Sequence, residues 1–187
     1  AAAGNGDIAA FTAINNTSVP VTATITVTPT ANSCPGIPKT FTITVNPTPG
    51  LTQPNDQVLC TGDATTAVNF TGPVSNSSYN WTNNNTLIGL AASGTGNIPS
   101  FTTTNNSNVP LIATVTVSVN ANGCSIPSKV FTITVNPMPA VTQPSNYIYC
   151  NGAPTSAIVF ATAVSGSTFN WTNDNVYIGL GASGTGT

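Results

Sequence analysis

Two pairs of segments alternate apolar residues with hydroxyl-bearing ones. Val21–Val27 and Phe41–Val45 carry an apolar residue at every second position with Thr between, and 113–119 and 131–135 repeat the pattern. Successive side chains of a β-strand point to opposite faces, so this pattern predicts strands with one buried and one solvated face. Threonine suits the solvated face because its β-branched side chain favours extended backbone.

Turn-forming residues and shorter apolar stretches fill the rest of the chain. Asn32–Gly36 and Asn122–Cys124 predict hairpin connections within the two pairs. No stretch shows the 3.6-residue periodicity of an amphipathic helix. About seven short strands in each 90 residues predict an all-β fold built of antiparallel β-sandwiches. The shorter strands are expected at Val58–Cys60, Ala67–Thr71, Tyr79–Thr82 and Phe101–Thr104.

The whole pattern recurs every 90 residues without a gap, and roughly half of the paired positions are identical. Cys34 corresponds to Cys124, and Ile88–Leu90 corresponds to Ile178–Leu180. A period of this length indicates small domains in series rather than the short coils of a solenoid.

Paired prolines mark the expected junctions between the repeated units. Pro47 and Pro49 follow one closing strand, and Pro137 and Pro139 follow its counterpart. Proline cannot continue a strand ladder and stiffens a short link. The repeats therefore divide the chain into the C-terminal part of one β-sandwich (1–46), one complete β-sandwich (47–136) and the N-terminal part of the next (137–187).

Charged side chains are almost absent, which removes several classes of function. The chain has two lysines, four aspartates, no histidine and a net charge of −2. This charge gives no electrostatic reason to bind nucleic acid or an anionic membrane, and no run of 18 apolar residues is present. Without histidine or glutamate no base is tuned near neutrality, so we expect neither an enzyme nor a cofactor or metal site. Weak charge repulsion favours lateral association of copies.

Four cysteines at repeating positions favour disulfides and an oxidising compartment. In one pairing, Cys60 bridges Cys124 within a unit, while Cys34 and Cys150 pair with repeats beyond this chain. In the other, Cys34–Cys60 and Cys124–Cys150 each join one unit to the next. The chain entropy lost by the unfolded state on closing the disulfide loop differs little between the two pairings. We favour the bridge within a unit, because a small sandwich benefits from its own covalent link.

Two groups of aromatic residues are candidates for function, the tryptophans and three tyrosines. Trp81 and Trp171 occupy equivalent strand positions, which favours the buried core tryptophan of a sandwich over a sugar-stacking platform. Tyr147, Tyr149 and Tyr177 replace non-aromatic residues of the preceding repeat. They are the better candidates for a ligand contact, although ordinary variation on a strand face also accounts for them.

Several segments together resemble a known family of repeats. These are the Cys-Thr-Gly and Cys-Asn-Gly turns at 60–62 and 150–152, the 79–82 strand, Asn122–Cys124 and the closing strand 131–137. In this order they resemble the PKD-like/Ig-like tandem repeats of very large adhesin-like surface proteins of Bacteroidota, which are often exported by type IX secretion. The resemblance implies a non-catalytic, extracellular stalk or adhesin and carries over no ligand-binding residue.

The chain begins and ends within a repeat, which leaves two explanations open. It is either a part of a longer array of repeats, which we favour, or a protomer. In a protomer, the incomplete units at the two ends of neighbouring copies would combine into one β-sandwich. The second explanation duplicates one short segment, because residues 1–7 and 181–187 belong to the same part of the repeat. Both predict a cell-surface fibre whose partners are neighbouring repeats or identical chains, through head-to-tail or lateral contacts. The alternative function is glycan binding through exposed aromatic residues.

Overall fold

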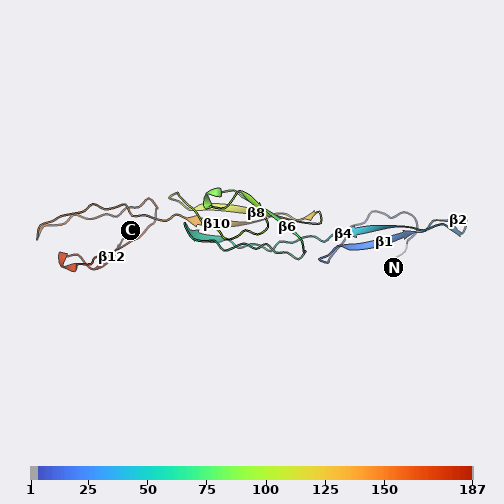
Figure 1. Cartoon of the computed structure of the whole chain (residues 1–187), viewed down its shortest axis with the longest axis horizontal. Helices are drawn as coiled ribbons and strands as arrows, with labels where there is room; N and C mark the ends of the chain where they lie inside the picture. The colour runs from blue at the N-terminus through green and yellow to red at the C-terminus, as the bar shows by residue number, and fades with distance from the viewer. Residues whose placement is uncertain (1–3, 187) are drawn as a thin grey trace.

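The chain is all-β. A computed structural model describes residues 4–186, so residues 1–3 and 187 of the expected end units lie outside the described part. Figure 1 shows the elements strung along one long axis, with β1 and β4 towards one end and β12 towards the other. We call residues 4–46 the N-terminal segment, 47–136 the central unit and 137–186 the C-terminal segment.

One six-stranded sheet organises the central unit. Its spatial order is β5-β10-β8-β6-β7, with β9 paired to β8. β8 and β10 form an antiparallel pair in which Val115 lies opposite Phe131. β5 runs parallel to β10, so the sheet departs from the all-antiparallel arrangement that the sequence predicts. The strands are β5 (Gln57–Cys60), β6 (Ser78–Asn83), β7 (Ser93–Thr95), β8 (Leu111–Ala121), β9 (Cys124–Ser125) and β10 (Lys129–Asn136).

Two of the predicted strands are reduced to single bridges. Val68 pairs with Ile98, and Ala64 pairs with Thr102, outside any named strand. The 310 turn η1 (Thr86–Ile88) was not predicted. It begins at Asn85, whose side chain accepts from the Leu87 N–H, and ends at Gly89 with φ of 96°. Short polar and glycine residues stabilise such turns locally, whereas a strand needs a continuous partner.

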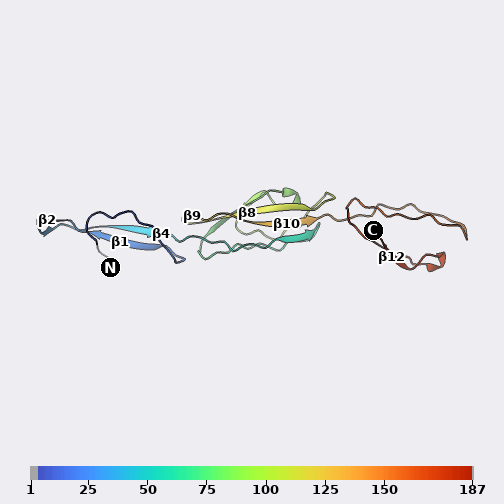
Figure 2. The ribbon, with the colours of Figure 1, turned by 180° about the vertical axis from the view of Figure 1, so that it is seen from behind.

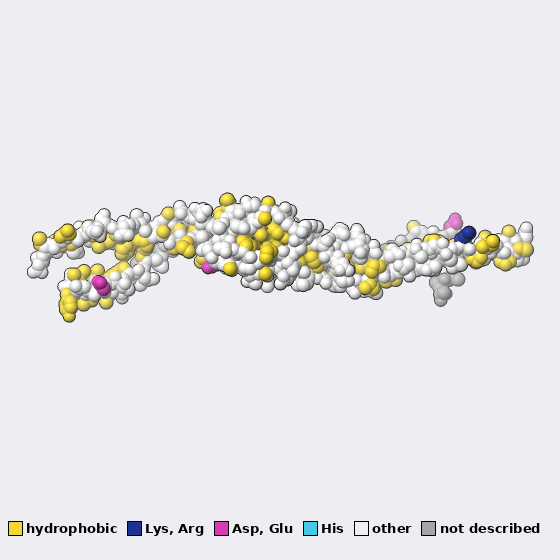
Figure 3. All heavy atoms as spheres, viewed as in Figure 1, with side chains coloured by type: hydrophobic (Ala, Val, Ile, Leu, Met, Phe, Trp, Pro, Cys, Tyr) yellow, Lys and Arg dark blue, Asp and Glu magenta, His cyan; other side chains and the backbone are white. Residues whose placement is uncertain are grey.

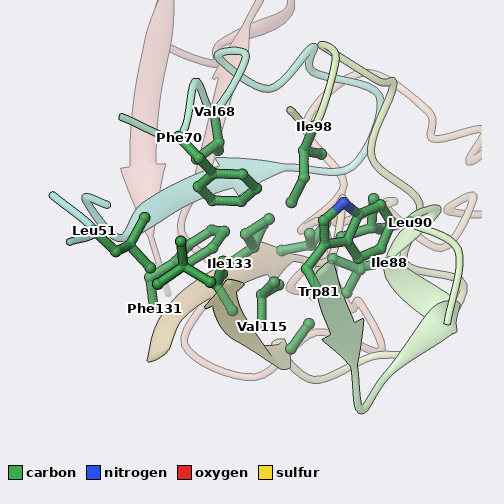
Figure 4. Close-up of a cluster of buried hydrophobic side chains, with 14 residues drawn as sticks. Leu51, Val68, Phe70, Trp81, Ile88, Leu90, Ile98, Val115, Phe131 and Ile133 are labelled. Carbon is green, nitrogen blue, oxygen red and sulfur yellow. The ribbon is translucent and has the colours of Figure 1, made fainter. Parts of the chain in front are cut away.

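The hydrophobic core lies on one face of this sheet. The inward positions of β8 and β10, among them Val115 and Phe131, are fully or almost fully buried. Figure 4 shows Trp81 of β6 and the bridged Val68 and Ile98 pointing into the same cluster. All members of the cluster fall between Leu51 and Val135. The alternating pattern therefore identified the buried faces of β8 and β10 correctly.

The N-terminal segment repeats the β8–β10 pair without the rest of the sheet. β1 and β4 are antiparallel, and Val21 lies opposite Val45 as Leu111 lies opposite Val135. Phe41 is 45% exposed, whereas its counterpart Phe131 is 2% exposed. The strands of this segment are β1 (Val21–Val27), β2 (Thr30–Ala31), β3 (Cys34–Pro35) and β4 (Lys39–Val45).

The C-terminal segment repeats the other part of the central unit. β11 (Phe169–Thr172) and β12 (Ser183–Gly186) pair as β6 and β7 do, and η2 (Val176–Ile178) repeats η1. Ile178 is 70% exposed, whereas its counterpart Ile88 is fully buried. Identical local patterns thus form similar local structure in all three parts, but only the central unit encloses a core. Figure 2 shows the same succession of parts from behind.

Candidate functional surface at the junctions and end segments

The junction before the central unit is held by prolines and asparagines. Pro47 and Pro49 are both buried. The Asn46 side chain donates a 2.8 Å hydrogen bond to the carbonyl of Asn122, at the tip of the β8–β9 hairpin. This contact joins the end of β4 to the next unit directly. After the central unit, Pro137 is buried and Pro139 is exposed.

An asparagine clamp supports the end of each closing strand. Asn105 is 4% exposed and its Nδ2 donates to the carbonyls of Val109 and Val135, both at 2.8 Å. Asn15 makes the same two bonds, to Val19 and Val45. The sequence analysis did not identify these two asparagines as structural residues, because asparagine is abundant in this chain and is typical of loops. Their recurrence at the same repeat position was the available signal.

The tryptophans lie where the repeat predicts, in two different environments. Trp81 is 7% exposed and belongs to the core, and Gly94 of β7 packs on its ring. A Cβ at position 94 would lie 2.2 Å from the ring. Trp171 contacts Gly184 in the same way but remains half-buried. The core position of Trp81 is therefore clear, whereas Trp171 lines an open apolar hollow with Ile158, Phe160 and Phe169, among other residues.

Two of the three unrepeated tyrosines contact each other. Tyr147 and Tyr149 stack with ring centroids 6.1 Å apart and an interplanar angle of 12°. Both are exposed. The Tyr149 hydroxyl accepts a hydrogen bond from the Ser156 N–H. Tyr177 lies in η2 and is 97% exposed.

All four cysteines are free thiols. Cys60 ends β5 opposite Asn136, the last residue of β10, whereas Cys124 follows the hairpin beyond the other end of β10. The eight residues of β10 separate these positions by about 23 Å, far more than the 4.4–6.8 Å between Cα atoms of a disulfide. The structure does not bring the favoured Cys60–Cys124 pair together. Cys34 lies in β3 of the N-terminal segment, and Cys60 lies in β5 of the central unit.

Two of the four aspartates accept hydrogen bonds from backbone N–H groups. Asp56 accepts from the Thr132 N–H at 2.6 Å, and Asp63 accepts from the Cys60 N–H at 2.9 Å. Both contacts hold β5 and its following turn on the sheet. Within residues 4–186 no three His, Cys, Asp or Glu side chains gather as a metal-binding group. Nor does that part of the chain contain a helix long and apolar enough to cross a bilayer.

No protein-family model and no curated protein matches this chain.

The surface carries few charges and scattered apolar patches. Figure 3 shows isolated Lys and Asp side chains among mostly uncharged atoms, with hydrophobic groups on the central unit and on both end segments.

Proposed function

We propose that this chain is a structural segment of an extracellular bacterial surface fibre or adhesin stalk. It is built from PKD-like/Ig-like β-sandwiches in tandem, and its role is to add length to the fibre. The single observation that carries this proposal is the end-on junction, where buried Pro47 and Pro49 and the Asn46–Asn122 hydrogen bond join consecutive units. A junction packed in this way transmits orientation from one unit to the next, as a spacer requires.

The scarcity of charged side chains and the engagement of the buried polar ones support the same proposal. Asp56 and Asp63 are engaged by backbone N–H groups, and the buried polar side chains bond to the backbone of their own unit. The exposed threonines on β1 and β4 form an uncharged face, as in the 2.8 Å Thr22–Thr44 contact. Such a surface offers few sites to proteases that cleave at charged residues, which fits an extracellular position.

Solution scattering tests the spacer function. We expect the reduced, monomeric chain to scatter as a rod, and each inserted copy of residues 47–136 to lengthen it by about 3–4 nm, the length of the 11-residue β8. Replacing Pro47 and Pro49 together with glycine should broaden the distance distribution, whereas the same change at the exposed Thr48 serves as control. A compact particle whose length does not grow with added units would contradict the proposal.

A glycan-binding function is the second candidate. The observation in its favour is the stacked, exposed pair of Tyr147 and Tyr149, since exposed aromatic faces pack against sugar rings. If this pair binds a glycan, replacing both tyrosines with alanine abolishes retention on a glycan array. The matched control replaces Gln57 and Leu59, their counterparts in the central unit. Unchanged retention after the tyrosine replacement would exclude this site.

A further inference from the structure

We propose that the central unit bears tension along the fibre, and that its parallel β5–β10 pair is the contact that resists this tension. The inference rests on the proposed function and deepens it, because it gives the units of the fibre a second role besides length. It is argued from contacts within residues 47–136 and from the way in which the chain enters and leaves this unit.

The chain enters and leaves the central unit at opposite ends. Residue 47 follows the segment that contains β4, whereas Asn136 ends β10 and leads into the C-terminal segment (Figures 1 and 2). Tension along the array therefore pulls the start of the unit in one direction and the end of β10 in the other. Among the described elements, β5 is the first strand after residue 47, so it is the first strand to receive the pull.

The tension loads β5 and β10 in shear, because the two strands run parallel. Ile133 pairs with Gln57 at one end of the ladder, and Asn136 pairs with Cys60 at the other. β5 is pulled back from its N-terminal end, while β10 is pulled forward from its C-terminal end. The hydrogen bonds of a parallel ladder are evenly spaced along the strands. They therefore share the load and break together instead of opening one after another.

Two side chains extend this contact beyond the backbone ladder. The Gln53 Nε2 donates to the carbonyl of Val130 at 2.6 Å, and the Asp56 carboxylate accepts from the Thr132 N–H at 2.6 Å. Both bonds join the chain that precedes β5 to β10. A hydrogen bond to a carboxylate is stronger than one between neutral groups, so Asp56 contributes the stronger of the two. β10 is therefore tied along most of its length to the segment that receives the pull.

The far end of β5 is anchored to the body of the unit. The Thr61 N–H donates to the carbonyl of Asn136 at 3.0 Å, and the Asp63 carboxylate accepts from the Cys60 N–H at 2.9 Å. The hydroxyl of the buried Thr103 donates to the carbonyl of Cys60 at 2.8 Å. Because β5 is held at both ends, the pull on it passes to β10 and to the core.

Single-molecule force measurement in two pulling directions tests the inference on one and the same fold. In the first direction, handles are attached to T48C and A140C, at two exposed positions that flank the unit, and the β5–β10 pair is loaded in shear. In the second direction, one handle is attached to the native, exposed Cys60 and the other to A140C. This direction separates Cys60 from Asn136 and opens the ladder from one end. The remaining cysteines are replaced by serine in both chains.

The expected result is a unit that is much more resistant in the first direction. At equal force, unfolding in the first direction should be at least about tenfold slower than in the second, because several hydrogen bonds break in one step rather than in succession. Each unfolding event of the unit is recognised by the length that it releases, about 3.3–3.6 Å for each residue between the two handles.

Two alanine variants separate the β5–β10 pair from stability in general. D56A removes the acceptor of the Thr132 N–H on β10, and N84A removes the acceptor of the Thr114 N–H on β8, a bond of 2.7 Å. Both are exposed bonds from a strand backbone to a side chain, but only the first lies between the two loaded strands. In the first direction, D56A should raise the unfolding rate at a given force by about tenfold, whereas N84A should leave it unchanged.

The same variant should behave differently in the second direction. There the ladder opens from Cys60 and Asn136, and the Asp56–Thr132 bond lies towards the end that opens last. We therefore expect D56A to leave the force of the first opening unchanged. An effect of D56A that appears in one pulling direction only would not arise from a general loss of stability.

Equal unfolding rates in the two directions would overturn the inference, as would equal effects of D56A and N84A in the first direction. Neither result bears on length, because a chain that scatters as a rod and lengthens with each added copy of residues 47–136 would still support the spacer function. A compact particle in solution scattering would contradict the fibre, while the directional resistance of the single unit would stand. Failure of the two proposals is therefore distinguishable.

Discussion

Replacing Phe131 by alanine should destabilise the central unit by about 3–5 kcal/mol, because the change leaves a cavity in a packed core. Phe131 is 2% exposed and lies opposite Val115 in the middle of the cluster. For a unit of this size the loss lowers the melting temperature by at least 10 °C, at roughly 4–8 °C for each kcal/mol. Urea unfolding followed by tryptophan fluorescence measures it, because Trp81 shares the same core.

The repeat supplies the control for this change. Phe41 occupies the equivalent place on β4 and is 45% exposed. In reduced chains diluted until they are monomeric, F41A should change the stability of the central unit by less than about 0.5 kcal/mol, as exposed substitutions usually do. Equal effects of the two changes would mean that the central unit does not hold a separate core.

Replacing Asn105 by alanine should cost about 1–3 kcal/mol, because it removes the Asn105 donor from the buried carbonyl of Val135, whereas the carbonyl of Val109 keeps the Ser107 hydroxyl as a donor. Asn105 also accepts from the backbone N–H of Ser107, at 2.9 Å. The expected loss exceeds that of an ordinary surface asparagine, since the side chain is 4% exposed. Thermal unfolding of the purified chain measures it.

The counterpart Asn15 again provides the comparison. It makes the same bonds to Val19 and Val45 but lies only half-buried, so water replaces the lost donor when it is changed to alanine. We expect N15A to leave the melting temperature of the central unit unchanged in the monomer. If N105A had no more effect than N15A, the clamp would not contribute to the stability of the closing strand.

The cysteines show why spacing alone did not indicate a pairing. Their separations in sequence made a bridge within a unit and a bridge between units almost equally favourable. The fold places Cys60 and Cys124 at opposite ends of β10, because β5 runs parallel to β10 and the hairpin extends beyond the other end. Parallel pairing of β5 is a contact between distant segments, and no local pattern encodes it.

The sequence alone determined the strands of β8 and β10, their buried faces, the repeat and the core position of Trp81. Alternation, turn residues and proline are local properties, so they specify local structure wherever they occur. Tertiary structure decided which copies of that pattern are buried, since Phe41 and Phe131 share one local sequence and differ only in what covers them. It also reduced Val68 and Thr102 to single bridges and gave Asn105 its buried role. Burial depends on partners distant in sequence, and only the assembled sheet supplies them.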